Sequence, residues 1–198
     1  MKWNMLTLLL VFVSPALAKP DRACVVPREG YFRIHVGTSG LFHSFAHEHS
    51  IEAQGVTGCA VIDPNDVTGS SVKLEFATAD IRVIDPKESE KDRMEVQKTM
   101  ETEVLRISEY PRVTFESTSV ERAGEVNRFR VHGNLTVRGK TLPVIIPVTL
   151  ARLADGTYRA SGAYSFKQSS FLIKPIQLAG GTVKVKDEVQ TQFELLLK

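Results

Sequence analysis

The sequence is poor in cysteine and tryptophan and carries no surplus of charge. Its 198 residues include 2 cysteines and 1 tryptophan, and 25 basic side chains stand against 23 acidic ones. A balanced charge gives no basic field for nucleic acid, so we expect no nucleic-acid partner. No low-complexity tract occurs, and the composition is typical of one globular domain.

Patterns that carry catalysis are also missing. No Ser-His-Asp or Cys-His set occurs in a context that would support nucleophilic chemistry. Gly180 and Gly181 are adjacent, but no helix pattern follows them, so they do not form a phosphate-binding loop. We therefore expect a protein that is not an enzyme and that needs no cofactor.

Residues 1–18 have the pattern of a signal peptide. Lys2 gives a positive start, residues 5–13 form an apolar run, and residues 16–18 (ALA) supply a small-residue cleavage site. The run is short for a membrane span, although an uncleaved anchor is the alternative, and no later segment reaches spanning length. We expect a mature chain of residues 19–198, periplasmic or secreted. It would contain no tryptophan, because Trp3 leaves with the leader.

Cys24 and Cys59 are the two cysteines. In an exported protein an even number favours one disulfide, which would join the mature N-terminus to the segment after a histidine-rich stretch. Two alternatives remain. Cys24 could carry a lipid, which the charged residues before it disfavour, or both thiols could be free.

Apolar and polar residues alternate along most of the chain after residue 30, and turns with glycine, asparagine or aspartate separate the alternating segments. Eight or nine such strands would pair antiparallel with their sequence neighbours. Pro143 and Pro147 would mark an edge, a bulge or strand ends outside the ladder. The clearest alternating segments are residues 31–36, 129–137, 142–150 and 158–166.

A sheet of this size must close or fold into two layers to hide its edges. We predict an all-β fold, an antiparallel up-and-down barrel of about eight strands with one inserted surface helix. Gly133, Ala160 and Gly162 fall on the inward faces and would leave room inside. An eight-stranded barrel is about wide enough to enclose one small or elongated ligand.

The inserted helix is predicted over residues 86–106. Asp85 reads as the N-cap, Pro86 as the first helical position, and Glu88 follows three residues after the cap. The helix would lie against the sheet or over an opening of the barrel. Its partly apolar stripe would consist of Met94, Val96, Met100 and Val104.

The histidine-rich stretch, residues 40–58, runs from a loop into a predicted strand. His47 and His49 are two residues apart and would share one strand face. With His43 they would form a metal site capable of hydrolytic or redox chemistry, and the protein would then be a periplasmic metalloprotein. The alternative is a polar cluster, or a contact with the polar head of a ligand.

Two motifs resemble those of a known family. Residues 109–117 (EYPRVTFES) are similar to YP-x-[IV]-x-F-x-S, and residues 131–139 (VHGNLTVRG) are similar to V-x-G-x-L-T-x-x-G. With their spacing, the helix and the leader, they make residues 30–198 resemble the YceI-like family of lipid- or polyisoprenoid-binding proteins. The resemblance implies a lipocalin-like β-barrel domain over residues 19–198. The chain departs from better-known members in its histidines and in residues 180–188, which leaves its ligand open.

The resemblance implies an amphipathic isoprenoid in the lumen, a polyprenyl phosphate or an isoprenoid quinone, held for carriage or storage. Transient contact with a membrane surface is compatible with that role. The alternatives are a filled core, or an envelope protein with an accidental cavity. The residues expected to contact the ligand are Phe42, Phe45, Phe76, Phe115, Phe129, Leu135, Tyr164 and Phe166.

Three cations are candidate partners of a polar head group. Lys184, Lys186 and Arg138 would pair with a pyrophosphate or a quinone head. A solvated strand face is the alternative. The oligomeric state is not indicated by any pattern.

Overall fold

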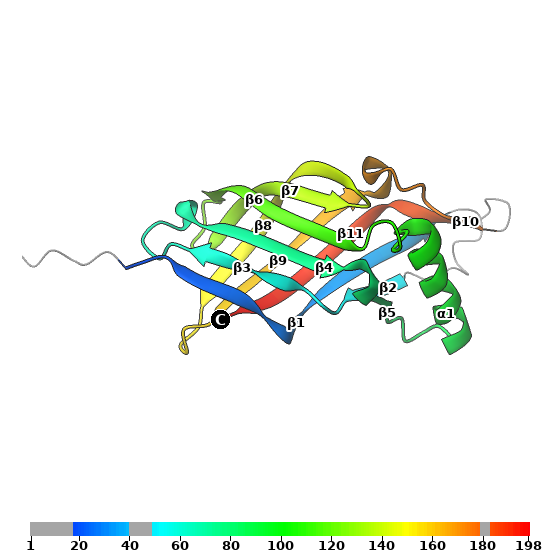
Figure 1. Ribbon diagram of the computed structural model, residues 1–198, viewed down its shortest axis with the longest axis horizontal. Helices are drawn as coiled ribbons and strands as arrows, with labels where there is room; N and C mark the ends of the chain where they lie inside the picture. Colours follow the sequence, from blue (N-terminus) through cyan, green and yellow to red (C-terminus); the bar gives the residue numbers. More distant parts are fainter. Residues whose placement is uncertain (1–17, 40–48, 179–182) are drawn as a thin grey trace, which may run out of the picture.

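The chain forms a closed antiparallel barrel. The computed structural model describes residues 18–39, 49–178 and 183–198. Within this part of the chain, eight strands pair all round in the order β1-β3-β4-β6-β7-β8-β9-β11, and β11 pairs with β1 to close the ring (Figure 1). The predicted all-β barrel is therefore confirmed. Its strands are β1 (Asp21–Ser39), β3 (Thr57–Ile62), β4 (Ser71–Ala77), β6 (Arg112–Arg122), β7 (Arg128–Val137), β8 (Lys140–Arg152), β9 (Tyr158–Lys167) and β11 (Val183–Leu197).

Short strands extend this ring at one end. β1 pairs with β3 through its first residues and with β2 (His49–Ala53) through residues 33–36. β2 pairs in turn with β5 (Ile81–Val83), and β10 (Gln177–Leu178) pairs with β11. Figure 1 shows β2, β5 and β10 at the same end of the elongated barrel, opposite the C-terminus.

Strand β1 is longer than the alternation predicts. Phe32 and Ile34 line the lumen, as expected, but the strand already begins at Asp21. Arg28 and Gly30 have left-handed φ values of 65° and 93°. The register with β11 shifts over this segment, and the bulge hides the first half of the strand from a search for strict alternation.

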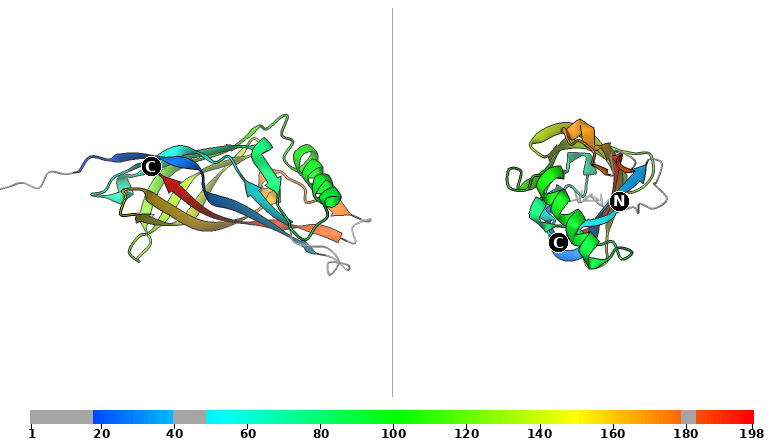
Figure 2. Two further views of the ribbon diagram at one scale, coloured as in Figure 1. Left: turned by 90° about the horizontal axis from the view of Figure 1, so that it is seen from below. Right: turned by 90° about the vertical axis from the view of Figure 1, so that its right-hand side faces the viewer.

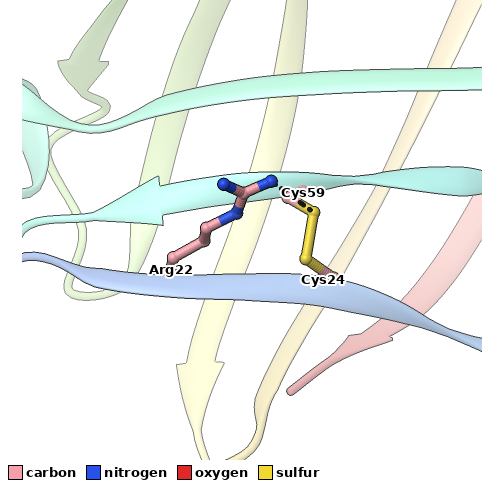
Figure 3. The surroundings of a disulfide bond; sticks show 3 residues. All are labelled: Arg22, Cys24 and Cys59. Atoms are coloured by element: carbon pink, nitrogen blue, oxygen red, sulfur yellow. Dashed lines mark hydrogen bonds between the residues drawn. A yellow bond between two sulfur atoms is a disulfide. The ribbon is translucent and has the colours of Figure 1, made fainter.

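The disulfide lies where the barrel closes (Figure 3). Cys24 of β1 is paired in register with Cys59 of β3, and their sulfur atoms are bonded. Cys24 also exchanges both main-chain hydrogen bonds with Lys198, at 2.8 Å each. The predicted bridge is confirmed: it links β1 to β3, while the hydrogen bonds to Lys198 link β1 to the end of β11.

The inserted helix begins later than predicted. α1 spans Glu90–Thr99 and continues as a π-helical turn, η4 (Met100–Val104). The N-cap is Ser89, whose hydroxyl accepts the Asp92 N–H at 3.2 Å, so the predicted cap at Asp85 is wrong. Asp85 is buried at the end of β5 and accepts the Lys87 N–H instead, which forms a turn before the helix.

The predicted apolar stripe of the helix is only partly correct. Met100 is buried and lines the lumen together with Val104, whereas Met94 is 65% exposed. Figure 2 shows α1 lying across one end of the barrel. In the described part of the chain, no helix has the length and apolar character needed to cross a membrane.

One helix side chain completes the edge of the sheet. The Gln97 side-chain oxygen accepts the Val83 N–H, and its amide nitrogen donates to the Ile81 carbonyl, both at 2.9 Å. The amide thus makes the two hydrogen bonds that a neighbouring strand would make. It fixes α1 and η4 to β5 at this end of the barrel.

Strand β8 is interior, but one stretch of it lacks a partner on one side. It pairs with β7 over residues 140–149, whereas its described pairs with β9 are restricted to residues 148–152. Pro143 and Pro147 both fall in the stretch without β9 pairs. Both prolines remain in register with β7, so the prediction of positions outside the ladder is wrong, whereas the predicted edge holds locally on the side that faces β9, where a proline has no N–H to donate.

Two of the three small inward residues do not leave open space. A Cβ on Gly133 would stand 2.5 Å from Cζ of Phe115, and one on Gly162 would stand 2.7 Å from Cζ of Phe193. Aromatic rings therefore cover both glycines, and the expectation of room at these positions is wrong. Ala160, the third, does line the lumen.

Candidate functional site

The barrel encloses an apolar cavity of about 270 Å³ along its axis. All eight barrel strands contribute lining residues, and η4 closes part of one end with Met100, Val104 and Leu105. Inward positions alternate with outward ones on each strand, so the lining follows directly from the strand pattern. Aromatic rings are prominent in this lining: Phe32, Phe76, Phe115, Phe129, Tyr164, Phe166 and Phe193.

The lining carries few polar side chains, and two of them are hydrogen-bonded to the main chain of neighbouring strands. Thr191 donates its hydroxyl to the Tyr164 carbonyl, and the Gln168 amide donates to the Lys186 carbonyl, both at 2.8 Å. Among the described residues, Tyr164 is the sole ionisable side chain of the lining, and burial raises its pKa. The cavity therefore suits an apolar chain and offers no charged group for acid–base chemistry.

Six of the predicted contact residues are brought together in this lining. They come from β4, β6, β7 and β9, and they are Phe76, Phe115, Phe129, Leu135, Tyr164 and Phe166. Phe42 and Phe45, predicted at the mouth, lie outside the described residues.

The sequence-based list misses one aromatic pair. Phe32 and Phe193 stack across the β1–β11 seam with ring centroids 5.9 Å apart and an interplanar angle of 10°. Phe193 alternates with Leu195 and Leu197 on β11, and that alternation was the signal that could have found it.

A polar cluster around Tyr158 lies where β1 and β9 begin. This side chain is 6% exposed and donates its hydroxyl to Asp21 Oδ2 at 2.8 Å. Burial, followed by the bond to Asp21, raises the pKa of Tyr158. The Arg152 guanidinium lies 3.8 Å from the same carboxylate and covers the Tyr158 ring. The cluster joins the starts of β1 and β9.

One end of the lumen is partly closed by the short turn η5 (Gln168–Phe171), which follows β9. Phe171 and Ile173 are 1% and 3% exposed and pack against inward residues of β6 and β7. Asp187 of β11 accepts the Ser169 N–H at 2.8 Å and its hydroxyl at 2.6 Å. These bonds lower the pKa of Asp187 and fix the turn to β11.

The histidine hypotheses fall mostly outside the described part of the chain. His43 and His47 lie outside it, as does the side chain of His49, although the His49 main chain opens β2 opposite Val36. The described residues contain no group of three or more metal-ligating side chains. The metal site, the polar cluster and the head-group contact stay predictions.

The three predicted head-group cations lie apart from the lumen lining. Lys184 and Lys186 line a hollow on the outer surface, and Arg138 donates to the Leu172 carbonyl at 3.4 Å. Their pairing with a head group stays a prediction.

An antiparallel barrel with an apolar, aromatic-lined lumen defines the class of lipocalin-like barrels. Residues 33–197 match the model of the YceI-like domain, so the chain belongs to the YceI-like family, as its two motifs predict. A UPF0312 protein of Pectobacterium carotovorum is 29% identical over 160 residues, which cover 79% of this chain and 67% of that protein. Protein YceI of Salmonella arizonae is 24% identical over 160 residues, 80% of this chain and 75% of that protein.

Two solved structures share the fold. The crystal structure of Burkholderia cenocepacia BcnA has a TM-score of 0.69 at 22% identity and covers 87% of this chain and 98% of its own. A polyisoprenoid binding domain from Saccharophagus degradans, implicated in plant cell wall breakdown, has a TM-score of 0.64 at 11% identity and covers 91% of this chain and 99% of its own. At these identities the likeness concerns the fold alone.

Proposed function

We propose that the protein is an exported lipid-binding protein that holds an amphipathic isoprenoid in its barrel for carriage or storage. A polyprenyl phosphate or an isoprenoid quinone supplies a long apolar tail with one polar head. The observation that carries the proposal is the lumen lining, in which Tyr164 is the sole ionisable side chain among the described residues. Family membership and the polyisoprenoid-binding neighbour support the same ligand class.

The binding free energy would come from burial of the tail. Each buried methylene contributes about 0.8 kcal/mol, so ten of them supply about 8 kcal/mol before the cost of association. No catalytic step is part of this proposal, and among the described lining residues Tyr164 is the sole ionisable side chain. The confirmed disulfide supports export, since such bonds persist in oxidising compartments.

The proposal is tested by titrating delipidated protein with a polyprenyl phosphate and with a quinone, comparing two variants of β9. Ala160 faces the lumen, whereas Ala163, three residues further on, is exposed. Ala160→Trp fills the lumen and should weaken binding at least tenfold, and Ala163→Trp should bind as the parent does. Equal binding by the two folded variants would place the ligand outside the barrel and overturn the proposal.

A further inference from the structure

A hollow on the outer wall near η5 is rich in lysine. Its rim is formed by Lys167, Lys174, Lys184 and Lys186, which are all exposed. The carboxylates of Asp187 and Glu188 line the same hollow, so its lysines outnumber its acids by two. Asp187 is occupied by the two bonds from Ser169. The hollow is therefore a positively charged part of the surface.

In the described part of the chain, the lysines of this hollow lack the carboxylate partners that many other basic side chains of the barrel have. Elsewhere, basic side chains lie beside carboxylates, as in Lys73–Glu116 at 3.4 Å and Arg128–Glu125 at 3.1 Å. Within the described ranges, no carboxylate lies within salt-bridge distance of the four ammonium groups. The charge of Lys167 contributes to the lowered pKa of Asp187. The charges of Lys174, Lys184 and Lys186 are available to an external anion, although the chain as a whole carries a formal charge of only +2.

An exposed leucine stands beside the hollow. Leu172 is 73% exposed and occupies a left-handed conformation, with φ 60°, at the end of η5. Its neighbours Phe171 and Ile173 are both buried, which directs the intervening side chain outward from a fixed turn. The packing of these two neighbours fixes the exposed position of the Leu172 side chain at this end of the barrel.

Cations flank this leucine on more than one side. Arg138, in the turn between β7 and β8, donates to the Leu172 carbonyl at 3.4 Å, and Lys174 follows two residues later. The Ser169–Asp187 bonds join η5 to the floor of the hollow. Figure 1 shows η5, in orange-brown, at the same end of the barrel as β10.

We propose that Leu172 and the four lysines form a docking surface for an anionic lipid membrane. An exposed apolar side chain beside lysine and arginine can insert at a membrane interface while the cations contact the head groups. The surface lies at the end of the barrel that η5 partly closes. Its purpose, transfer of an isoprenoid between membrane and lumen, rests on the proposed function, whereas the docking itself does not.

Docking is measured by co-sedimentation of delipidated protein with vesicles of phosphatidylglycerol and phosphatidylcholine in equal parts, against vesicles of phosphatidylcholine alone. We expect binding to the anionic vesicles that weakens as salt is raised. Lys184→Gln with Lys186→Gln should weaken it roughly 30-fold, from about fivefold for each lysine near a charged surface. The matched control is Lys19→Gln with Lys198→Gln, which removes the same charge from exposed positions that form no salt bridge among the described residues, and Figure 1 shows the C-terminus at the opposite end of the barrel from β10.

The leucine is tested with a substitution that suits its backbone. Asparagine tolerates the left-handed region better than leucine, so Leu172→Asn should fold and should bind the anionic vesicles about tenfold more weakly. Val126→Asn is the control, because Val126 is 89% exposed in the β6–β7 hairpin. Equal binding to both kinds of vesicle, or equal losses in test and control variants, overturns the docking surface. Because these vesicles contain no isoprenoid, that failure leaves the lumen proposal intact.

Discussion

Phe32 and Phe193 stack across the seam where β1 meets β11, with ring centroids 5.9 Å apart. Both rings line the lumen, so the closure of the barrel and the wall of the cavity depend on the same contact. A bound apolar tail would lie against this pair.

The pair offers a site for an optical reporter, because the only tryptophan of the chain is Trp3, within the predicted signal peptide. Phe193→Trp should give an emission that shifts to longer wavelength when lipid is extracted and water enters the lumen. Gln192→Trp, the next residue and exposed on the outer face, should give an emission that extraction leaves unchanged. If the emission wavelength of the residue 193 reporter did not change when lipid is extracted, the result would argue against an occupied lumen.

The Cys24–Cys59 bridge should contribute substantially to stability. It closes a sequence separation of 35 residues, for which the chain-entropy model gives about 3–4 kcal/mol. Urea denaturation of Cys24→Ser with Cys59→Ser should show that loss in the free energy of unfolding. A double variant as stable as the oxidised parent would mean that the main-chain bonds to Lys198 hold β1 unaided.

Gly133 should tolerate no larger side chain. A Cβ there would stand 2.5 Å from the Phe115 ring and 2.6 Å from the Glu116 carbonyl oxygen, so Gly133→Ala should cost about 1–3 kcal/mol. At Gly69 the nearest atom to an added Cβ lies at 3.8 Å, so Gly69→Ala serves as the control and should leave the free energy of unfolding nearly unchanged. Similar thermal midpoints for the two variants would contradict the packing described for Phe115.

The attachment of η5 to β11 should depend on pH. The Ser169 bonds lower the pKa of Asp187 from 3.8, so the carboxylate stabilises the folded turn above pH 3.8. This contribution is lost as pH falls through the lower, folded-state pKa. The protection factor of the Ser169 amide, its exchange rate relative to the unprotected rate at the same pH, should fall in acid in the parent, while Asp187→Asn should show low protection at neutral pH as well. Protection that is the same in parent and variant would show that Asp187 does not hold the turn.

The lumen was largely predictable because its lining follows one simple rule. Side chains alternate across a strand, so the inward positions of Phe76, Phe115 and Tyr164 could be found without coordinates. The disulfide was likewise predictable from the number of cysteines and the predicted signal peptide. The chemical identity of the ligand could not be predicted in the same way, because an apolar lining selects a ligand by its apolar character and its size.

The errors arose where tertiary contacts overrode a local pattern. Asp85 has the sequence of an N-cap, but its burial at the end of β5 moved the helix start to Ser89. Gly133 and Gly162 looked like empty space because the rings that cover them come from other strands. The first half of β1 was hidden by the left-handed residues Arg28 and Gly30, which break the alternation.

The central claim, an isoprenoid in the lumen, is tested most directly on protein purified from its natural compartment without detergent. Native mass spectrometry should show a mass above that of the disulfide-bonded chain, and solvent extraction should release a stoichiometric isoprenoid identified by its fragmentation. Ala160→Trp, purified in parallel, should carry much less of it than Ala163→Trp. A native mass equal to that of the chain alone, with no extractable lipid, would contradict the account.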